Sequence, residues 1–196
     1  MPSLIFATHN AHKLEEIQQI LSVSDKLTIT NLAEIGFHDE IEETSLTLEG
    51  NASIKSRAVY DREGGNVFSE DTGLEVMALG MEPGVHTARY AGESRDADAN
   101  MDKLLSALAN SKERTARFRT VISLLWEGEE HLFEGIVNGR IALSKSGTTG
   151  FGYDPIFIPY GYDRTFAELS SDIKNGISHR YRAMCGMQKF LSERIG

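Results

Sequence analysis

The sequence predicts a single α/β domain, in one or two lobes, with a mixed β-sheet. Short β-rich runs alternate with helical segments, no repeat or long linker interrupts them, and two long β-type runs follow one another directly. Alternation of strands and helices is typical of parallel strand neighbours, whereas adjacent β-type runs are typical of an antiparallel hairpin. We therefore expect residues 1–196 to form one domain with both kinds of strand pairing.

The N-terminal half begins with a strand, a loop and a helix. The strand is the run SLIFAT, and Leu14, Ile17 and Leu21 recur at helical spacing within 10–21. The elements expected next are a strand at 26–32, a helix at 47–65 that ends at two glycines, a strand region at 66–79 interrupted by an acidic cluster, a loop at 80–94 and a helix at 98–111.

The C-terminal half is expected to begin with a hairpin. Its two β-type runs, 114–128 and 130–143, are joined at Gly128. The elements that follow are expected to be a glycine-rich loop at 146–155, a short strand at 156–159 and a closing helix at 177–195.

Composition excludes several classes of protein. No apolar run approaches the roughly 20 residues of a membrane helix, and the N-terminus lacks the pattern of a signal peptide, so we expect a cytoplasmic protein without a membrane partner. Cys185 is the only cysteine, which excludes an intrachain disulfide and a thiolate metal cage. The formal net charge of -9 argues against general binding to nucleic acid, but not against a small anion in a local basic pocket.

The segment SEDTG places Glu70 beside Asp71 at the end of an apolar run. Carboxylates repel each other and are costly to bury without a partner, so the pair either faces water as a loop or binds a cation. Mg²⁺ prefers oxygen ligands and takes one or two protein carboxylates together with substrate phosphates. Glu43, Glu70 and Asp71 suit that role, and ordinary exposed loop charges are the alternative.

A possible phosphate site lies where the first strand meets the first helix. Thr8, Asn10 and Lys13 offer a hydroxyl, an amide and an ammonium at a helix N-terminus, where backbone N–H groups favour anions. The alternative is that Asn10 only caps the helix and Lys13 is only solvated. The turn lacks the glycines of a Walker loop.

Two further segments fit a nucleoside. In the glycine-rich loop, Phe151 and Tyr153 offer flat faces for a base, although such a loop also serves as a plain connection. A basic cluster follows, which is a candidate site for an anion or for the edge of a base. The alternative is that it forms a solvated helix face. The cluster comprises Lys174, His179, Arg180 and Arg182. Together with the acidic segment, these groups combine phosphate-binding donors, a flat hydrophobic surface and hard-metal oxygens, and they favour a functional site built on loops.

Five segments, in order over nearly the whole chain, carry a family resemblance. They are ATHNAHKLEE, EETSLTLEGNASIKSRA, SEDTGLEVMALGMEPGVHTARYAGE, GTTGFGYDPIF and AELSSDIKNGISHRYRA. The sequence resembles the inosine/xanthosine triphosphate pyrophosphatases, the Ham1-like hydrolases of non-canonical purine nucleotides. The resemblance implies Mg²⁺-dependent cleavage of the α–β phosphoanhydride of ITP, dITP or XTP. It also implies a homodimer of two-lobed α/β subunits, each with a long mixed sheet flanked by helices and an active-site cleft between the lobes.

The resemblance also implies roles for residues. The triphosphate-contacting turn falls on Thr8, His9, Asn10, Ala11, His12 and Lys13. The catalytic carboxylate is Asp71, the metal is held by Asp71 and Glu43, and Thr72 touches the nucleotide. The nucleoside pocket matches Phe151, Gly152, Tyr153, Asp154, Lys174, His179 and Arg180.

The chemistry of the substrate assigns further roles to some of these residues. Attack of water on the α-phosphorus calls for a proton acceptor, which we assign to Asp71, and for cations that stabilise the departing pyrophosphate. The 6-oxo group of hypoxanthine and xanthine calls for donors, for which His179 and Arg180 are candidates.

Four positions depart from the family pattern. His9 and His12 stand where glycines are common, and Thr72 stands for a common serine and keeps the hydroxyl. Glu70 stands where an aspartate is frequent, which leaves open whether Glu70 shares the metal. Two other functions stay open. A Maf-like pyrophosphatase would cleave the same bond in other nucleotides, and a nucleotide-binding protein without turnover would not need Asp71.

Overall fold

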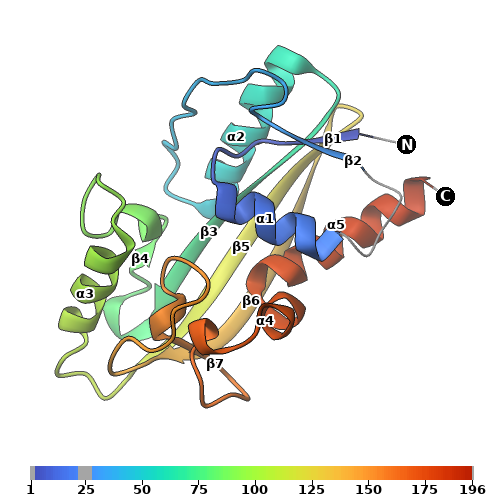
Figure 1. Ribbon diagram of the computed structural model, residues 1–196. Coiled ribbons are helices and arrows are strands. Elements are labelled where there is room, and N and C mark those ends of the chain that lie inside the picture. Colours follow the sequence, from blue (N-terminus) through green and yellow to red (C-terminus); the bar gives the residue numbers. More distant parts are fainter. Residues whose placement is uncertain (1–2, 22–27, 196) are drawn as a thin grey trace. The chain divides into compact units, whose positions relative to one another are not determined.

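The computed structural model describes residues 3–21 and 28–195 and confirms the predicted α/β class with a mixed sheet (Figure 1). The strand order is β2-β1-β3-β5-β6-β7, and β4 pairs with β3. Two predicted elements, the helix at 10–21 and the strand at 26–32, are only partly described. Lys26, Leu27 and the side chain of Leu21 lie outside the described residues. No helix in the described ranges is long and apolar enough to cross a membrane.

The chain divides into two compact units. The first comprises Met1–Asp71, Thr120–Gly135 and Arg180–Gly196, and the second comprises Thr72–Arg119 and Ile136–His179. Residues of β3, β5 and β6 contribute to both units.

The first unit contains the parallel part of the sheet. Strand β1 (Ser3–Phe6) pairs in parallel with β2 (Thr28–Asn31) and with β3 (Asn66–Val76). Its helices are α1 (Ala11–Leu21), α2 (Leu48–Glu63) and α5 (His179–Ile195). Thr47 caps α2, and its hydroxyl accepts a hydrogen bond from the Gly50 N–H.

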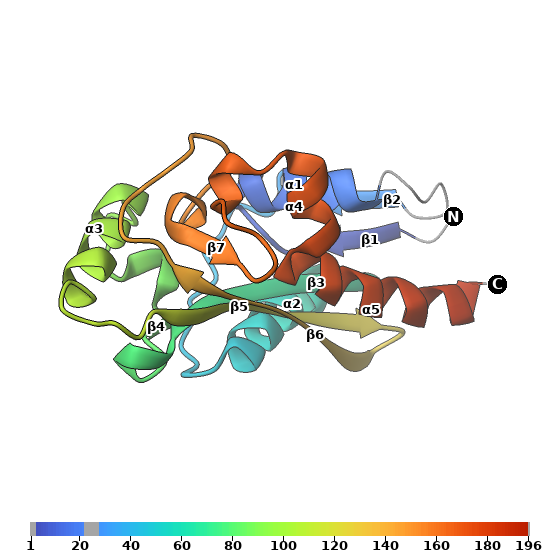
Figure 2. The ribbon, with the colours of Figure 1, turned by 90° about the horizontal axis from the view of Figure 1, so that it is seen from below.

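Helices α1 and α2 lie on opposite sides of the sheet in this unit (Figure 2). Because side chains alternate across the sheet, its two faces have separate cores. Phe6 and Phe68 stack on the face covered by α1 and α5, with ring centroids 4.5 Å apart. Ala7 and Val67 lie on the other face, where Val59 of α2 covers them. This alternation continues along β3 into the polar residues and thereby sets the geometry of the candidate site.

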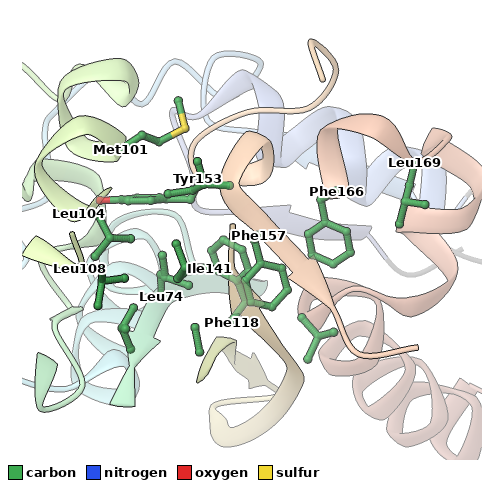
Figure 3. Packing of buried hydrophobic residues seen from close by; sticks show 14 residues of the cluster. Leu74, Met101, Leu104, Leu108, Phe118, Ile141, Tyr153, Phe157, Phe166 and Leu169 are labelled. Carbon is green, nitrogen blue, oxygen red and sulfur yellow. The ribbon is translucent and has the colours of Figure 1, made fainter. Parts of the chain in front are cut away.

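The second unit has one aromatic core (Figure 3). Phe118 lies against Phe157 and Phe166, with centroids 4.7 and 6.4 Å away. The regular elements of the unit are β4 (Pro83–Gly84), α3 (Ala97–Ala107), β7 (Phe157–Pro159) and α4 (Ser171–Ile177), with the 3-10 helices η1 (Met77–Leu79), η2 (Thr87–Arg89), η3 (Asp154–Ile156) and η4 (Phe166–Glu168).

The predicted hairpin is formed by β5 (Thr115–Trp126) and β6 (Glu129–Ile141), which are neighbours in the sheet. Glu127 and Gly128 connect them with φ angles of 51° and 85°. Positive φ at both central residues is the signature of a type I′ turn, whose twist matches that of paired strands.

Two predictions about elements were wrong. The acidic cluster does not interrupt a strand, because Glu70 and Asp71 lie inside β3 and are buried at 2% and 7% exposure. The closing helix does not begin at Ile177, because Ser178 adopts an extended conformation (φ -65°, ψ 161°) that separates α4 from α5.

Candidate active site

Glu70 and Asp71 face opposite sides of the sheet. Successive side chains of a strand point to opposite faces, and Phe68 lies against the α1 and α5 face. Glu70, two residues on, bonds Arg180 of α5, whereas Ser69 and Asp71 bond residues of α2. Two adjacent carboxylates therefore have separate environments instead of one shared site.

Helix α2 holds both oxygens of Asp71. The Asn51 amide Nδ2 donates a long hydrogen bond of 3.3 Å to Oδ2, and Lys55 Nζ lies 3.3 Å from Oδ1. Lys55 Nζ also lies 2.6 Å from Oε1 of Glu43. Asn51 and Lys55 are four residues apart, which places them on one face of the helix.

Burial and neighbouring charges shift the pKa values of this group. Burial raises the pKa of the Asp71 carboxyl above its ordinary value, and Glu43 adds to the rise, while Lys55 and Lys13 oppose it. Burial alone would lower the pKa of Lys55, but Asp71 and Glu43 outweigh it and raise that pKa. Lys55 therefore stays a full positive charge between two carboxylates.

Glu70 belongs to a second charged group, on the opposite face. The Arg180 guanidinium donates from Nε and Nη2 to the two oxygens of Glu70, at 2.8 and 2.7 Å, and from Nη1 to Glu16. Lys13 Nζ lies 3.2 Å from Oε1 of Glu70. Burial opposes the ionisation of Glu70, but Arg180 and then Lys13 outweigh it and hold the pKa of Glu70 well below its ordinary value. Glu70 is thus a buried ion-pair partner.

The strand-to-helix turn before α1 is exposed at His9, Asn10, Ala11 and His12. The Asn10 side chain accepts from the Lys13 N–H at 3.2 Å and so caps α1, as the alternative interpretation of this turn expected. The Thr8 hydroxyl accepts from the Asn10 N–H at 3.1 Å. His9 Nε2 lies 3.1 Å from the carbonyl of Asp39. The turn follows β1, whose Phe6 pairs with Phe68 of β3, two residues before Glu70.

The chemistry of Glu43 and Asp71 fits a hard divalent cation. Their oxygens converge on one ammonium, so two negative charges face one positive charge. Mg²⁺ needs only one or two protein carboxylates when phosphates and waters complete its shell. Within the described ranges no group of three or more His, Cys, Asp or Glu side chains is arranged for a metal, so a cage built by the protein alone is not found there.

The second unit contains a separate group around Phe151. Asp154, 3% exposed, accepts from the Phe151 N–H at 2.8 Å and from Lys174 Nζ at 2.6 Å through the same oxygen, Oδ2. Lys174 Nζ also lies 5.0 Å from the centroid of the Phe151 ring. A Cβ atom at Gly150 would lie 2.1 Å from Oδ2 of Asp154, so only glycine fits there. The Asp154–Lys174 pair thus fixes the conformation of the loop that presents Phe151.

Other residues predicted to contact the nucleotide also lie in this unit. Tyr153 is buried and donates from its hydroxyl to the Thr87 carbonyl at 2.9 Å, and burial raises its pKa. His179 is 4% exposed and stacks on Phe118 with centroids 4.7 Å apart. Gly152 and Thr72 are partly exposed.

The structure brings some of the predicted site residues together. Glu43 and Asp71 meet at Lys55, Lys13 and Arg180 meet at Glu70, and Phe151 and Lys174 meet at Asp154. The residues that the sequence analysis missed are Glu16, Asn51 and Lys55. The i, i+4 spacing of Asn51 and Lys55 near the start of a helix was a usable signal, whereas nothing local connects Glu16 with Arg180.

Comparisons with known proteins give one consistent result. A model of the Ham1 family matches residues 4–190. The dITP/XTP pyrophosphatase of Flavobacterium johnsoniae is 51% identical over 181 residues, which cover 92% of this chain and 93% of the relative. The Staphylococcus aureus Ham1 protein structure matches with a TM-score of 0.88 at 40% identity, covering 97% of this chain and 98% of that one. A HAM1 protein from Coxiella burnetii gives a TM-score of 0.90 at 36% identity, covering 98% and 100%.

Proposed function

Because the chain belongs to the Ham1 family, we propose that it hydrolyses the α–β phosphoanhydride of ITP, dITP and XTP. The products are the nucleoside monophosphate and pyrophosphate, and the reaction removes these nucleotides from the pool. Relatives about half identical over nearly their whole length carry the name dITP/XTP pyrophosphatase. The observation that carries the proposal is the Asp71 carboxylate, buried on β3 and held by an amide and an ammonium of α2.

In this proposal the first unit acts on the phosphates. Residues Thr8 to Lys13 receive the triphosphate at the N-terminus of α1, where N–H groups and the Lys13 ammonium favour negative charge. Lys55 adds a second ammonium beside Asp71. Positioning and charge stabilisation carry most of the catalysis of phosphoryl transfer, so these cations stabilise the departing pyrophosphate.

Asp71 and Glu43 would hold Mg²⁺, and Asp71 accepts the proton of the attacking water. The donor set supports this role, since both residues offer carboxylate oxygens directed at a common cation. The ion would supply Lewis-acid polarisation of phosphoryl oxygens and neutralise charge that develops on the leaving group.

The second unit is proposed to receive the nucleoside. Phe151 offers a stacking face, and Gly152, Tyr153, Asp154 and Lys174 form its surroundings, with Thr72 as a further contact. His179 is our candidate donor to the 6-oxo group that distinguishes hypoxanthine and xanthine from adenine. A base-edge role for Arg180 stays a prediction, and its three bonds to Glu70 and Glu16 argue for a supporting role first.

We also propose that residues 1–196 act as one catalytic domain, as a cytoplasmic homodimer with neither nucleic acid nor a membrane as partner. The net charge of -9 argues against nucleic acid as a partner. The homodimer is what the family resemblance implies. Sedimentation velocity at micromolar concentration tests the dimer, and a single species of monomer mass contradicts it.

Pyrophosphate release is the first test. With Mg²⁺ and ITP, XTP, dITP, ATP, GTP or dCTP, we expect the 6-oxo non-canonical purines to lead in kcat/KM by orders of magnitude. Asp71→Asn is expected to lose turnover by a factor of about 100 or more, because general-base catalysis is typically worth that much. Asp96→Asn is the matched control, since asparagine also caps a helix and Asp96 only caps α3.

The other outcomes decide between the alternatives. If dCTP and other pyrimidine nucleotides lead, the Maf-like function replaces the proposed one. If nucleotides bind but none is cleaved, or if Asp71→Asn retains full activity, the hydrolase proposal is wrong.

A further inference from the structure

Asn51 connects the two residues proposed to hold Mg²⁺. Its side chain is 1% exposed and has partners at both ends: Nδ2 donates to Oδ2 of Asp71 at 3.3 Å, and Oδ1 accepts from the Ser45 N–H at 2.9 Å. A backbone N–H only donates and an ionised carboxylate only accepts, so the two ends of the amide cannot be exchanged. Asn51 therefore holds Asp71 directly and holds the loop in which Ser45 follows Glu43 by two residues.

Other contacts fasten the same loop to the start of α2. The Ser45 hydroxyl accepts from the Thr47 N–H at 3.1 Å, and the Thr47 hydroxyl accepts from the Gly50 N–H at 3.1 Å. A Cβ atom at Gly50 would lie 2.0 Å from the Ser45 hydroxyl oxygen, so the loop lies directly on the helix. One turn after Asn51, Lys55 bonds both Glu43 and Asp71.

We propose that Asn51 is a positioning residue that sets the spacing between Glu43 and Asp71 for the metal. The inference rests on the proposed function, which uses these two carboxylates for Mg²⁺. In this role Asn51 acts through the two carboxylates, by its bonds to Asp71 and to the Ser45 N–H. Outer-shell partners of metal ligands typically change metal affinity or activity by about 10- to 100-fold when they are mutated.

The chain offers a closely matched control in Asn100. Asn100 is also the fourth residue of its helix, is 2% exposed and uses both ends of its amide. Its Oδ1 accepts from the Ala91 N–H at 2.6 Å, and its Nδ2 donates to the Ala88 carbonyl at 3.0 Å. Both of its partners are backbone groups, so it reproduces the structural part of the role of Asn51 without a carboxylate partner.

The experiment measures the Mg²⁺ concentration for half-maximal pyrophosphate release from ITP in the wild type and in Asn51→Ala and Asn100→Ala. We expect Asn51→Ala to raise that concentration about 10- to 100-fold, with the KM for ITP at saturating Mg²⁺ within about 2-fold of the wild type. Asn100→Ala is expected to leave both constants within about 2-fold, whatever stability it loses in urea.

A second variant separates the two bonds of Asn51. Asn51→Asp retains an acceptor for the Ser45 N–H but has no donor for Asp71. By NMR, we expect the Ser45 amide proton to exchange at the wild-type rate in Asn51→Asp and much faster in Asn51→Ala, with the turnover of both variants reduced. Because the Ser45 readout does not depend on turnover, it also shows whether the variants retain the local fold.

The outcomes are distinct. If the wild type releases pyrophosphate and Asn51→Ala keeps the Mg²⁺ dependence of Asn100→Ala, Asn51 is purely structural and this inference is wrong while the proposed function stands. If the wild type releases no pyrophosphate from any nucleotide, the proposed function fails and removes the basis of the inference.

Discussion

At the residue scale, the two neighbouring acids of β3 differ because the pleat of a strand separates them. Glu70 faces Arg180 and Lys13 on one side, and Asp71 faces Asn51 and Lys55 on the other. Glu70 forms a two-oxygen ion pair that lowers its pKa, whereas burial raises the pKa of Asp71. One dipeptide thus supplies a structural ion pair and a candidate catalytic carboxylate.

The ion pair gives a stability prediction. We expect Glu70→Gln to lower the free energy of unfolding by about 3–5 kcal/mol, because Arg180, 1% exposed, would keep its charge and lose its main carboxylate partner. Urea denaturation at neutral pH measures the change.

Glu130→Gln is the comparison for this prediction. Its carboxylate also pairs with an arginine, but the side chain of Arg57 is 56% exposed, so water solvates the remaining charge and the loss should stay near 1 kcal/mol. If the two variants lose equal free energy of unfolding, the burial of the Arg180 charge does not add to the cost of removing its partner.

Sequence reasoning worked for residues whose partners are nearby in the chain. Asn10 directly precedes α1, which begins at Ala11, and caps it by accepting a hydrogen bond from the Lys13 N–H. This signal is carried by the local sequence. Sequence reasoning failed for Glu70, because the cations that make its burial possible come from α1 and, 110 residues away, from α5. A sequence window around SEDTG contains neither cation.

At the element scale, the hairpin turn between β5 and β6 places one residue in an unfavourable backbone conformation. Glu127 has a φ angle of 51°, in the left-handed region that asparagine and glycine tolerate better than glutamate. Its N–H donates to Oδ1 of Asn66 at 2.9 Å, and this bond does not depend on the Glu127 side chain. The turn therefore offers a substitution that affects conformation alone.

We expect Glu127→Asn to raise the free energy of unfolding by about 0.5–1 kcal/mol, because asparagine followed by glycine is favoured in type I′ turns. The shift of the urea midpoint measures it. Glu127→Ala serves as the reference, since alanine gains no such conformational advantage. An asparagine variant no more stable than the alanine variant would show that the turn is not strained.

The two wrong element predictions have physical reasons. Polar residues in SEDTG indicated a break in the strand, but buried partners on both faces of the sheet let β3 continue. The apolar spacing of residues 177–195 indicated one helix, but the serine at 178 separates two. Serine before a run of helical residues is a recognised start signal, so this second error was avoidable from sequence, whereas the first depended on tertiary contacts.

At the scale of the whole molecule, apolar packing forms the cores of the described residues. These residues make three hydrophobic clusters, and no group of three or more His, Cys, Asp or Glu side chains among them is arranged for a metal. We therefore expect the proposed Mg²⁺ to serve the reaction and to contribute little to folding.

Removal of the metal tests this separation. With excess EDTA we expect pyrophosphate release to fall to background while the thermal midpoint stays within about 2 °C, because an ion stabilises the folded state by RT ln(1 + [L]/Kd), which is small when the ion binds weakly. Excess Mg²⁺ should restore full turnover. A large fall in the midpoint on chelation would reveal a structural ion and contradict the expectation.

The opposite orientation of Glu70 and Asp71 also makes their order important. Exchanging them would leave composition, net charge and hydropathy unchanged, yet each environment would receive a side chain of the wrong length: a shorter one opposite Arg180 and a longer one between Asn51 and Lys55. A one-residue deletion just before the pair would likewise send each acid to the other face of the sheet. Substitution tables score aspartate and glutamate as near equivalents, and at these two positions the fold does not treat them so.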